Sequence, residues 1–167
     1  TVTNATFVGL ENYKKIFATP EFTNALVFTT QFVIVSVITV NVFAFALAYL
    51  LTRKLKGTNI FRTVFFMPNL IGGIVLGYIW QLIINGVLYR FDYSITSNPN
   101  FGYWGLVILM NWQMIGYIMI IYIAGIGNIP TDIIEAAKVD GAGSLTTLFR
   151  ITIPSVMPSI TICLFLT

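Results

Sequence analysis

Charge is the property that this sequence most lacks. Only 9% of its 167 residues are charged and 57% are hydrophobic, whereas an ordinary soluble domain is about 25% charged. The few charges leave uncharged runs of 31, 27, 39 and 17 residues, at 22–52, 63–89, 93–131 and 151–167. A helix needs about 20 apolar residues to cross the hydrocarbon of a bilayer. The sequence therefore excludes a water-soluble protein and predicts three complete membrane spans, followed by a fourth that is cut short at Thr167.

Residues for metal and nucleophilic chemistry are also scarce. Histidine is absent and Cys163 is the single cysteine, which excludes a zinc site, a Ser-His-Asp triad and a disulfide framework within this chain. No G-x-x-x-x-G-K-[ST] loop is present, so the chain does not bind nucleotide through such a loop. Its net charge of +3 lies beside apolar runs, which favours membrane orientation over nucleic-acid binding. We expect no cofactor and no metal, and we expect Cys163 to act as an apolar residue of a span.

The apolar runs predict an all-α fold, a polytopic transmembrane helix bundle that forms one domain over 1–167. The expected spans are about 25–51, 63–85, 103–126 and the truncated 151–167, with a polar segment over 127–150. Basic residues predict the sidedness, because Lys and Arg resist translocation. The loops after the first and third spans hold six of them: Arg53, Lys54, Lys56, Arg62, Lys138 and Arg150. These loops are therefore expected inside the cell. An outer N-terminus without a signal sequence requires an earlier span, so we expect the domain to be incomplete at both ends.

Polar residues inside the expected spans allow two interpretations. In the second span Asn69, Gly73, Gly77, Gln81 and Asn85 recur every four residues, which would place them along one side of a continuous helix. The stripe is compatible with helix packing and with the lining of a substrate pathway. The residues that we consider for a pathway are Asn69, Gln81, Asn111, Gln113 and Tyr117. No complete span contains an ionisable Asp, Glu, Lys, Arg or His, which argues against a proton relay.

The polar segment after the third span predicts a short helix. Pro130 suits a first helical turn, Asp132 and Glu135 have the spacing of a capping box, and Gly141 suits a helix end. We therefore expect a helix from about Pro130 to Val139. Its small side chains favour insertion into a partner's groove over binding to lipid, because Ala and Gly permit close backbone approach.

The same segment carries a spaced motif. Glu135-Ala136-Ala137 is followed after three residues by Gly141, and after nine more by Ile151-Thr152-Ile153-Pro154. This pattern resembles the EAA loop of permease subunits of binding-protein-dependent ABC importers, with Ile153 where that family has Leu. Asp140 and Ala142 extend it to the form found in carbohydrate permeases related to those for maltose and glycerol phosphate. Two upstream segments, Phe7–Tyr13 and Phe61–Pro68, are similar to other segments of the same permeases.

The resemblance implies a transport subunit that is not itself an enzyme, in a bacterial or archaeal cell membrane. Its implied partners are ATP-hydrolysing subunits, a second and different permease subunit, membrane lipid, and an extracellular or periplasmic solute-binding protein. Its implied cargo is a sugar or oligosaccharide that moves inward. The coupling residues carried over from the family are Glu135, Ala136, Ala137, Asp140, Gly141, Ala142, Ile153 and Pro154.

In that carry-over, Glu135 makes a polar contact with the ATPase and the two alanines allow its close approach. Gly141 permits the turn out of the helix, and Ile153 with Pro154 sets the start of the next span. Two alternatives stay open. One is an ABC permease for a solute other than a sugar, and the other is an ATP-independent pore or carrier.

Overall fold

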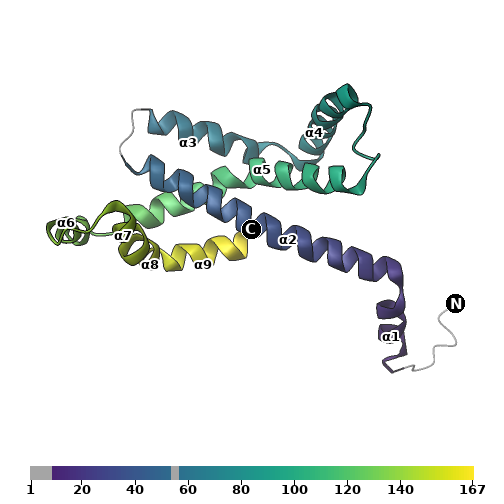
Figure 1. The fold of residues 1–167 in the computed structure, drawn as a ribbon, viewed down its shortest axis with the longest axis horizontal. Helices are drawn as coiled ribbons and strands as arrows, with labels where there is room; N and C mark the ends of the chain where they lie inside the picture. The colour runs from purple at the N-terminus through teal and green to yellow at the C-terminus, as the bar shows by residue number, and fades with distance from the viewer. Residues whose placement is uncertain (1–8, 54–56) are drawn as a thin grey trace. The chain divides into compact units, whose positions relative to one another are not determined.

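The computed structural model describes residues 9–53 and 57–167, and these residues form helices and no strand (Figure 1). The all-α fold predicted from the apolar runs is confirmed. The chain divides into two compact units, one that ends at Val35 and one that extends from Ser36 to Thr167. The helix contacts and grooves described below lie within the second unit.

The first unit contains α1 (Glu11–Ala18) and the beginning of α2 (Pro20–Leu51). An exposed ion pair of 2.9 Å joins Lys15 Nζ to a Glu11 carboxylate oxygen one turn away, which stabilises a short helix slightly. The helix ends at Ala18, and its C-cap residue Thr19 directly precedes Pro20. Part of the expected motif Phe7–Tyr13 falls here, with Phe7 and Val8 outside the described residues.

The longest helices are α2, of 32 residues, and α5 (Pro99–Gly127), of 29 residues. At about 1.5 Å per residue both exceed the roughly 30 Å of bilayer hydrocarbon, and both are apolar enough to cross it. Each begins a few residues before the expected start, at a proline in the first turn. The side-chain oxygen of Asn98 caps α5 by accepting a 2.9 Å hydrogen bond from the Asn100 backbone N–H.

The segment expected as one span over 63–85 is interrupted. It consists of α3 (Thr58–Phe66), a 3₁₀ turn η2 (Met67–Leu70) and α4 (Gly73–Leu88), which is followed by η3 (Tyr89–Phe91). Pro68 lies in the first turn of η2, and Ile71 after it is extended. Proline lacks the N–H needed inside a helix, so the chain turns here and resumes at Gly73. Only the 19 residues from Gly73 to Phe91 are long and apolar enough to span.

After α5 the chain forms α6 (Thr131–Val139), α7 (Ser144–Thr147), the π-helical turn η4 (Leu148–Thr152), α8 (Ile153–Ser155) and α9 (Met157–Leu166). The last segments bend by 67° between Ser155 and Met157. Pro154 and Pro158 flank this bend, and each lacks a helical donor. The expected fourth span is therefore a bent pair of helices and not a straight helix.

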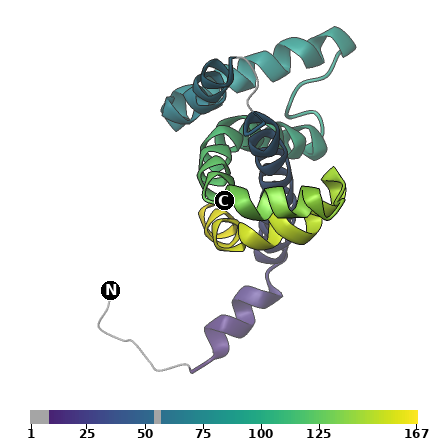
Figure 2. The ribbon, with the colours of Figure 1, turned by 90° about the vertical axis from the view of Figure 1, so that its left-hand side faces the viewer.

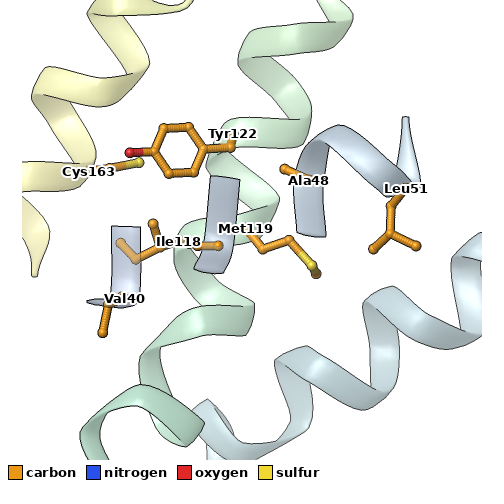
Figure 3. Packing of buried hydrophobic residues seen from close by; sticks show 8 residues of the cluster. Val40, Ala48, Leu51, Ile118, Met119, Tyr122 and Cys163 are labelled. Carbon is orange, nitrogen blue, oxygen red and sulfur yellow. The ribbon is translucent and has the colours of Figure 1, made fainter. Parts of the chain in front are cut away.

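Three helices form the core of the second unit. The buried residues are Val40, Ala44, Ala48 and Leu51 of α2, Ile118, Met119 and Tyr122 of α5, and Cys163 of α9. Figure 3 shows the Tyr122 ring directed toward Cys163, and Figure 2 shows α9 beside α5 and the second half of α2. The Cys163 side chain is fully buried in this cluster, with its sulfur beside the Tyr122 hydroxyl.

Helix α3 approaches α5 so closely that only glycine fits at the crossing. A Cβ atom on Gly116 would lie 1.8 Å from the backbone oxygen of Phe65, far inside van der Waals contact. This backbone contact places the turn at η2 against α5 and fixes the position of Asn69 beside it.

Candidate functional site

Helix α6 ends at a residue with a positive φ, a backbone conformation that glycine adopts more easily than any other residue. Gly141 has φ +76°, in the left-handed region, and its N–H donates a 3.1 Å hydrogen bond to the Lys138 oxygen. The Ala142 N–H donates a 2.9 Å hydrogen bond to the Ala137 oxygen. These two bonds form a complete Schellman motif. The predicted helix end near Gly141 is confirmed, and the turn sends the chain toward α7.

The start of α6 differs from the prediction. The helix begins at Thr131, Pro130 is its N-cap residue, and no side chain caps it. The capping box expected from Asp132 and Glu135 is therefore absent. The reason is position, because Asp132 already lies inside the first turn and not at the N-cap, where its oxygen would reach a free N–H.

Helix α6 has an inner and an outer side. Ala137 is 6% exposed and Ile134 is half-buried, so this side packs against the protein's own chain. Ile133 and Val139 are exposed, at 46% and 88%, and Ala136 is exposed between them. We call these three residues the outer face of α6. The alanines of the motif thus separate, since Ala136 faces outward and Ala137 supports the helix from within.

A groove of about 550 Å³ lies on another side of α6, and we call it the α6 groove. Its charged lining residues are Arg53, Glu135 and Lys138. Its hydroxyl-bearing lining residues are Tyr49, Thr52, Thr131, Ser144, Thr147 and Thr152. Its apolar lining residues are Ile126, Ile129, Ile134 and Ala142. In the described part of the chain, no cation lies within ion-pair distance of the Glu135 carboxylate.

Arg53 is held in a defined position at the end of α2. Its Nη2 donates a 2.8 Å hydrogen bond to the Tyr49 hydroxyl, and its guanidinium carbon lies 4.6 Å from the centre of the Tyr49 ring. A hydrogen bond together with a cation–π contact restricts a side chain that is otherwise flexible. Arg53 is therefore an oriented positive group in the lining of the α6 groove.

Of the other residues that the resemblance predicts for coupling, Asp140 is the C-cap of α6 and is exposed. Ile153 and Pro154 begin α8, directly before the 67° bend. The π-helical turn η4 separates them from α7. The motif residues thus lie on both sides of the segment formed by α7 and η4, with Ile153 and Pro154 inside the first arm of the bent pair.

The polar stripe expected along the second span is interrupted, because Asn69 lies in η2 whereas Gly73, Gly77, Gln81 and Asn85 lie in α4. Asn69 lies in η2, and its amide is 3.9 Å from the Met114 sulfur of α5. It therefore neighbours the part of α5 that carries Gln113 and Tyr117, both half-buried. Gln81 lies on α4 and is exposed. Three of the candidates thus share one region, and Gln81 lies on a helix whose surface is nearly all open.

Asn111 has a packing role in this structure. Its amide nitrogen donates hydrogen bonds of 2.9 Å to the Thr39 hydroxyl of α2 and 2.8 Å to the Val107 oxygen one turn back. Asn111 therefore connects α5 to α2 through a side-chain hydrogen bond. Of the two interpretations left open for this residue, packing is the one that the contacts support.

A second polar connection was not singled out from the sequence as a site. The Tyr122 hydroxyl donates a 2.7 Å hydrogen bond to the Asn41 side-chain oxygen, and the Asn41 amide donates to the Val37 oxygen at 2.8 Å and to the Thr167 hydroxyl at 3.2 Å. The network joins α2, α5 and the residue that follows α9. Asn41 as a polar residue in an apolar run is a signal for helix packing, but nothing in the sequence pairs it with Tyr122.

Comparison with known proteins identifies the protein family of this chain. Residues 56–167 match the family described as binding-protein-dependent transport system inner membrane component. This match covers most of the chain, so the chain belongs to that family. The chain is a helical membrane component of this family, and the family resemblance stated from the sequence is confirmed.

Two relatives of this chain are named as permeases of carbohydrate transport systems. The probable starch degradation products transport system permease protein AmyD of Thermoanaerobacterium thermosulfurigenes is 43% identical over 169 residues, which cover 96% of this chain and 58% of that protein. The arabinooligosaccharides transport system permease protein AraP of Bacillus subtilis (strain 168) is 32% identical, covering 91% of this chain and 52% of that protein. The chain thus spans less than two thirds of the length of these relatives.

Solved structures share the fold. The crystal structure of a bacterial ABC transporter involved in the import of the acidic polysaccharide alginate matches with a TM-score of 0.83 at 19% identity, covering 98% of this chain and 61% of that chain. The bacterial alginate ABC transporter in complex with an alginate pentasaccharide-bound periplasmic protein matches with a TM-score of 0.80 at 22% identity, covering 95% of this chain and 59% of that chain. The interrupted α3–α4 segment and the bent α7–α9 segment lie within an arrangement of this kind.

Proposed function

We propose that this chain is the membrane-spanning part of a permease that imports a sugar or oligosaccharide by ATP-driven ABC transport in a bacterial or archaeal cell membrane. Separate subunits hydrolyse the ATP, a second permease subunit completes the pathway, and a solute-binding protein delivers the sugar. The relatives named for starch products and arabinooligosaccharides support the substrate class. The alginate transporter solved with its periplasmic protein supports the assembly.

The single observation that carries the coupling proposal is the outer face of α6. Ile133, Ala136 and Val139 are exposed along one side of a nine-residue helix that a Schellman motif ends, with the carboxylates of Asp132 and Asp140 on the same side. A helix that exposes apolar side chains around a small residue is suited to a partner's groove. We assign this face, with Glu135 and Asp140 beside it, as the docking surface for the ATPase subunit. Ala137 supports the helix, and Ile153 with Pro154 transmits its movement to α9.

We propose that the sugar pathway passes the region where Asn69, Gln113 and Tyr117 lie near one another. Amide and phenol groups donate and accept hydrogen bonds without charge, which suits a neutral polyhydroxylated ligand. Gln81 is assigned to the part of the pathway that α4 lines. Asn111 is assigned to helix packing, because both hydrogen atoms of its amide nitrogen are used within the chain.

The test is uptake by the full-length permease reconstituted with its partner permease, its ATPase subunits and its solute-binding protein. We expect uptake of maltooligosaccharide or arabinooligosaccharide that requires ATP and the binding protein. Sugar uptake by the permease alone, without the ATPase, would contradict the proposal and favour an ATP-independent carrier.

A second candidate substrate follows from one relative. The sn-glycerol-3-phosphate transport system permease protein UgpA of Brucella abortus is 26% identical over 93% of this chain. A phosphate ester needs a cationic group in the pathway, and none of Asn69, Gln81, Gln113 and Tyr117 supplies one. Competition by glycerol 3-phosphate for uptake of labelled oligosaccharide discriminates the two, and we expect none.

A further inference from the structure

Two grooves share Tyr49 in their linings. The α6 groove has three charged and six hydroxyl-bearing side chains beside an apolar part formed by Ile126, Ile129, Ile134 and Ala142. A second groove of about 600 Å³ is lined almost entirely by apolar groups, including Val42, Phe45 and Leu50 of α2 and Phe149 and Ile153 beyond α7. We call it the apolar groove. Tyr49 belongs to both linings, and both lie within the unit from Ser36 to Thr167.

The α6 groove has an excess of positive charge. It contains Arg53 and Lys138 against one carboxylate, Glu135. No described acidic group lies within ion-pair distance of either cation. Arg53 is already oriented by Tyr49, so little side-chain entropy is lost when it binds an anion. Guanidinium and ammonium groups together with hydroxyl donors are the chemistry that recognises a phosphate ester.

The position of the α6 groove relative to the membrane follows from the proposed function, on which this inference rests. If the outer face of α6 docks on the ATPase, the groove between α6 and the ends of α2 and α5 lies on the membrane side of that helix. The apolar groove then continues from it along α2 into the hydrocarbon. Basic pockets between helices at the cytoplasmic surface are known sites for anionic lipid headgroups.

We propose that the two grooves together bind one anionic phospholipid of the inner leaflet. Its phosphate lies between Arg53 and Lys138, and one acyl chain packs in the apolar groove by van der Waals contact. Glu135 opposes the headgroup charge. The lipid therefore contacts a coupling residue, Glu135, and the end of α2 at the same time, which makes the position of α6 dependent on membrane composition.

The experiment uses the full-length permease in its complete transporter, purified from nanodiscs that contain phosphatidylglycerol and phosphatidylcholine. Native mass spectrometry measures how many lipids of each type stay bound. We expect retained phosphatidylglycerol in preference to phosphatidylcholine. Arg53→Gln combined with Lys138→Gln is expected to reduce this retention about tenfold, because two charge-assisted contacts are lost.

Three further variants separate the parts of the proposal. Ala46→Trp fills the apolar groove from an exposed lining position and is expected to lower phosphatidylglycerol retention with both cations intact. Glu135→Gln is expected to raise it. Arg90→Gln combined with Lys14→Gln removes two exposed cations that line neither groove, so this double variant is the charge-matched control and retention is expected to stay at the wild-type level.

Several outcomes overturn the proposal. Equal retention of the two lipids by the wild type shows no anionic lipid site. Displacement of all phosphatidylglycerol by excess inorganic phosphate shows a small-anion site without a role for the apolar groove. Absence of bound lipid in the assembled transporter, with lipid bound only to the isolated permease, shows that another subunit fills the grooves. Lipid retention is read without transport, so failure of sugar uptake leaves this test interpretable.

Discussion

Helices α4 and α5 contain the same kinds of residue but use them differently. In α5, Gly116 lies against the backbone of α3, and Asn111 is hydrogen-bonded to α2. In α4, Gly73 and Gly77 have open space where a Cβ would be, and Gln81 is exposed. Both helices have glycine and amide groups at helical spacing. These glycine and amide residues therefore pack against other helices of this chain in α5, whereas those in α4 are exposed.

The largest expected effect distinguishes the two sets of glycines. Gly116→Val places side-chain atoms on the Phe65 backbone, which cannot yield as a flexible side chain does. We expect a loss of about 3 kcal/mol or more of stability. The matched variant Gly77→Val meets nothing within 4 Å in this chain and should leave stability almost unchanged. Thermal unfolding of the detergent-purified permease measures both.

The comparison is contradicted if the two variants unfold at the same temperature. A strong effect of Gly77→Val that appears only in the assembled transporter would sharpen it. That result would mean that the open side of α4 packs against another subunit.

The next effect concerns the turn after α6. Gly141→Asp forces an L residue to φ +76°, which costs about 1–2 kcal/mol and disturbs the Schellman motif. We expect sugar uptake to fall at least tenfold, with the permease still in the membrane, because the turn lies outside the spans. Gly143→Asp is the matched control, since Gly143 has φ −69° and accepts a side chain without strain. Equal uptake by the two variants would show that the turn has no role in coupling.

A smaller effect distinguishes the two amides. Asn111→Leu removes the hydrogen bonds to Thr39 and Val107, and we expect a loss of about 1 kcal/mol. Gln81→Leu removes an exposed amide and should change stability much less, while lowering sugar uptake. Unfolding midpoints and initial uptake rates of both variants are compared. Unchanged uptake with Gln81→Leu would remove Gln81 from the proposed pathway.

The sequence was informative where a local rule decides the structure. Long uncharged runs predicted α2 and α5. Gly141 predicted the end of α6, because the positive φ of a helix end favours glycine whatever the helix packs against. The interruption at Met67–Gly72 was not predicted as a break, although Pro68 was its signal. Proline within a span is compatible with a kink or with a complete stop, and the contact between Gly116 and Phe65 accompanies the stop here.

The candidate site was predicted only in part for a related reason. The motif around Glu135 identified the segment, but the direction of each side chain depends on what α6 packs against. Ala136 and Ala137 are adjacent and identical, yet one is exposed and the other buried. The contribution of Tyr49 to the α6 groove required knowledge of where α2 ends relative to α6, which no residue pattern within either helix contains.

The central claim is that the outer face of α6 binds the ATPase subunit, and co-purification of the full-length permease with its ATPase tests it most directly. Val139 is 88% exposed, so Val139→Asp should leave the permease folded. The account predicts that Val139→Asp and Glu135→Lys weaken retention of the ATPase, while Val139→Leu retains it like the wild type. Full retention with both Val139→Asp and Glu135→Lys would contradict the account.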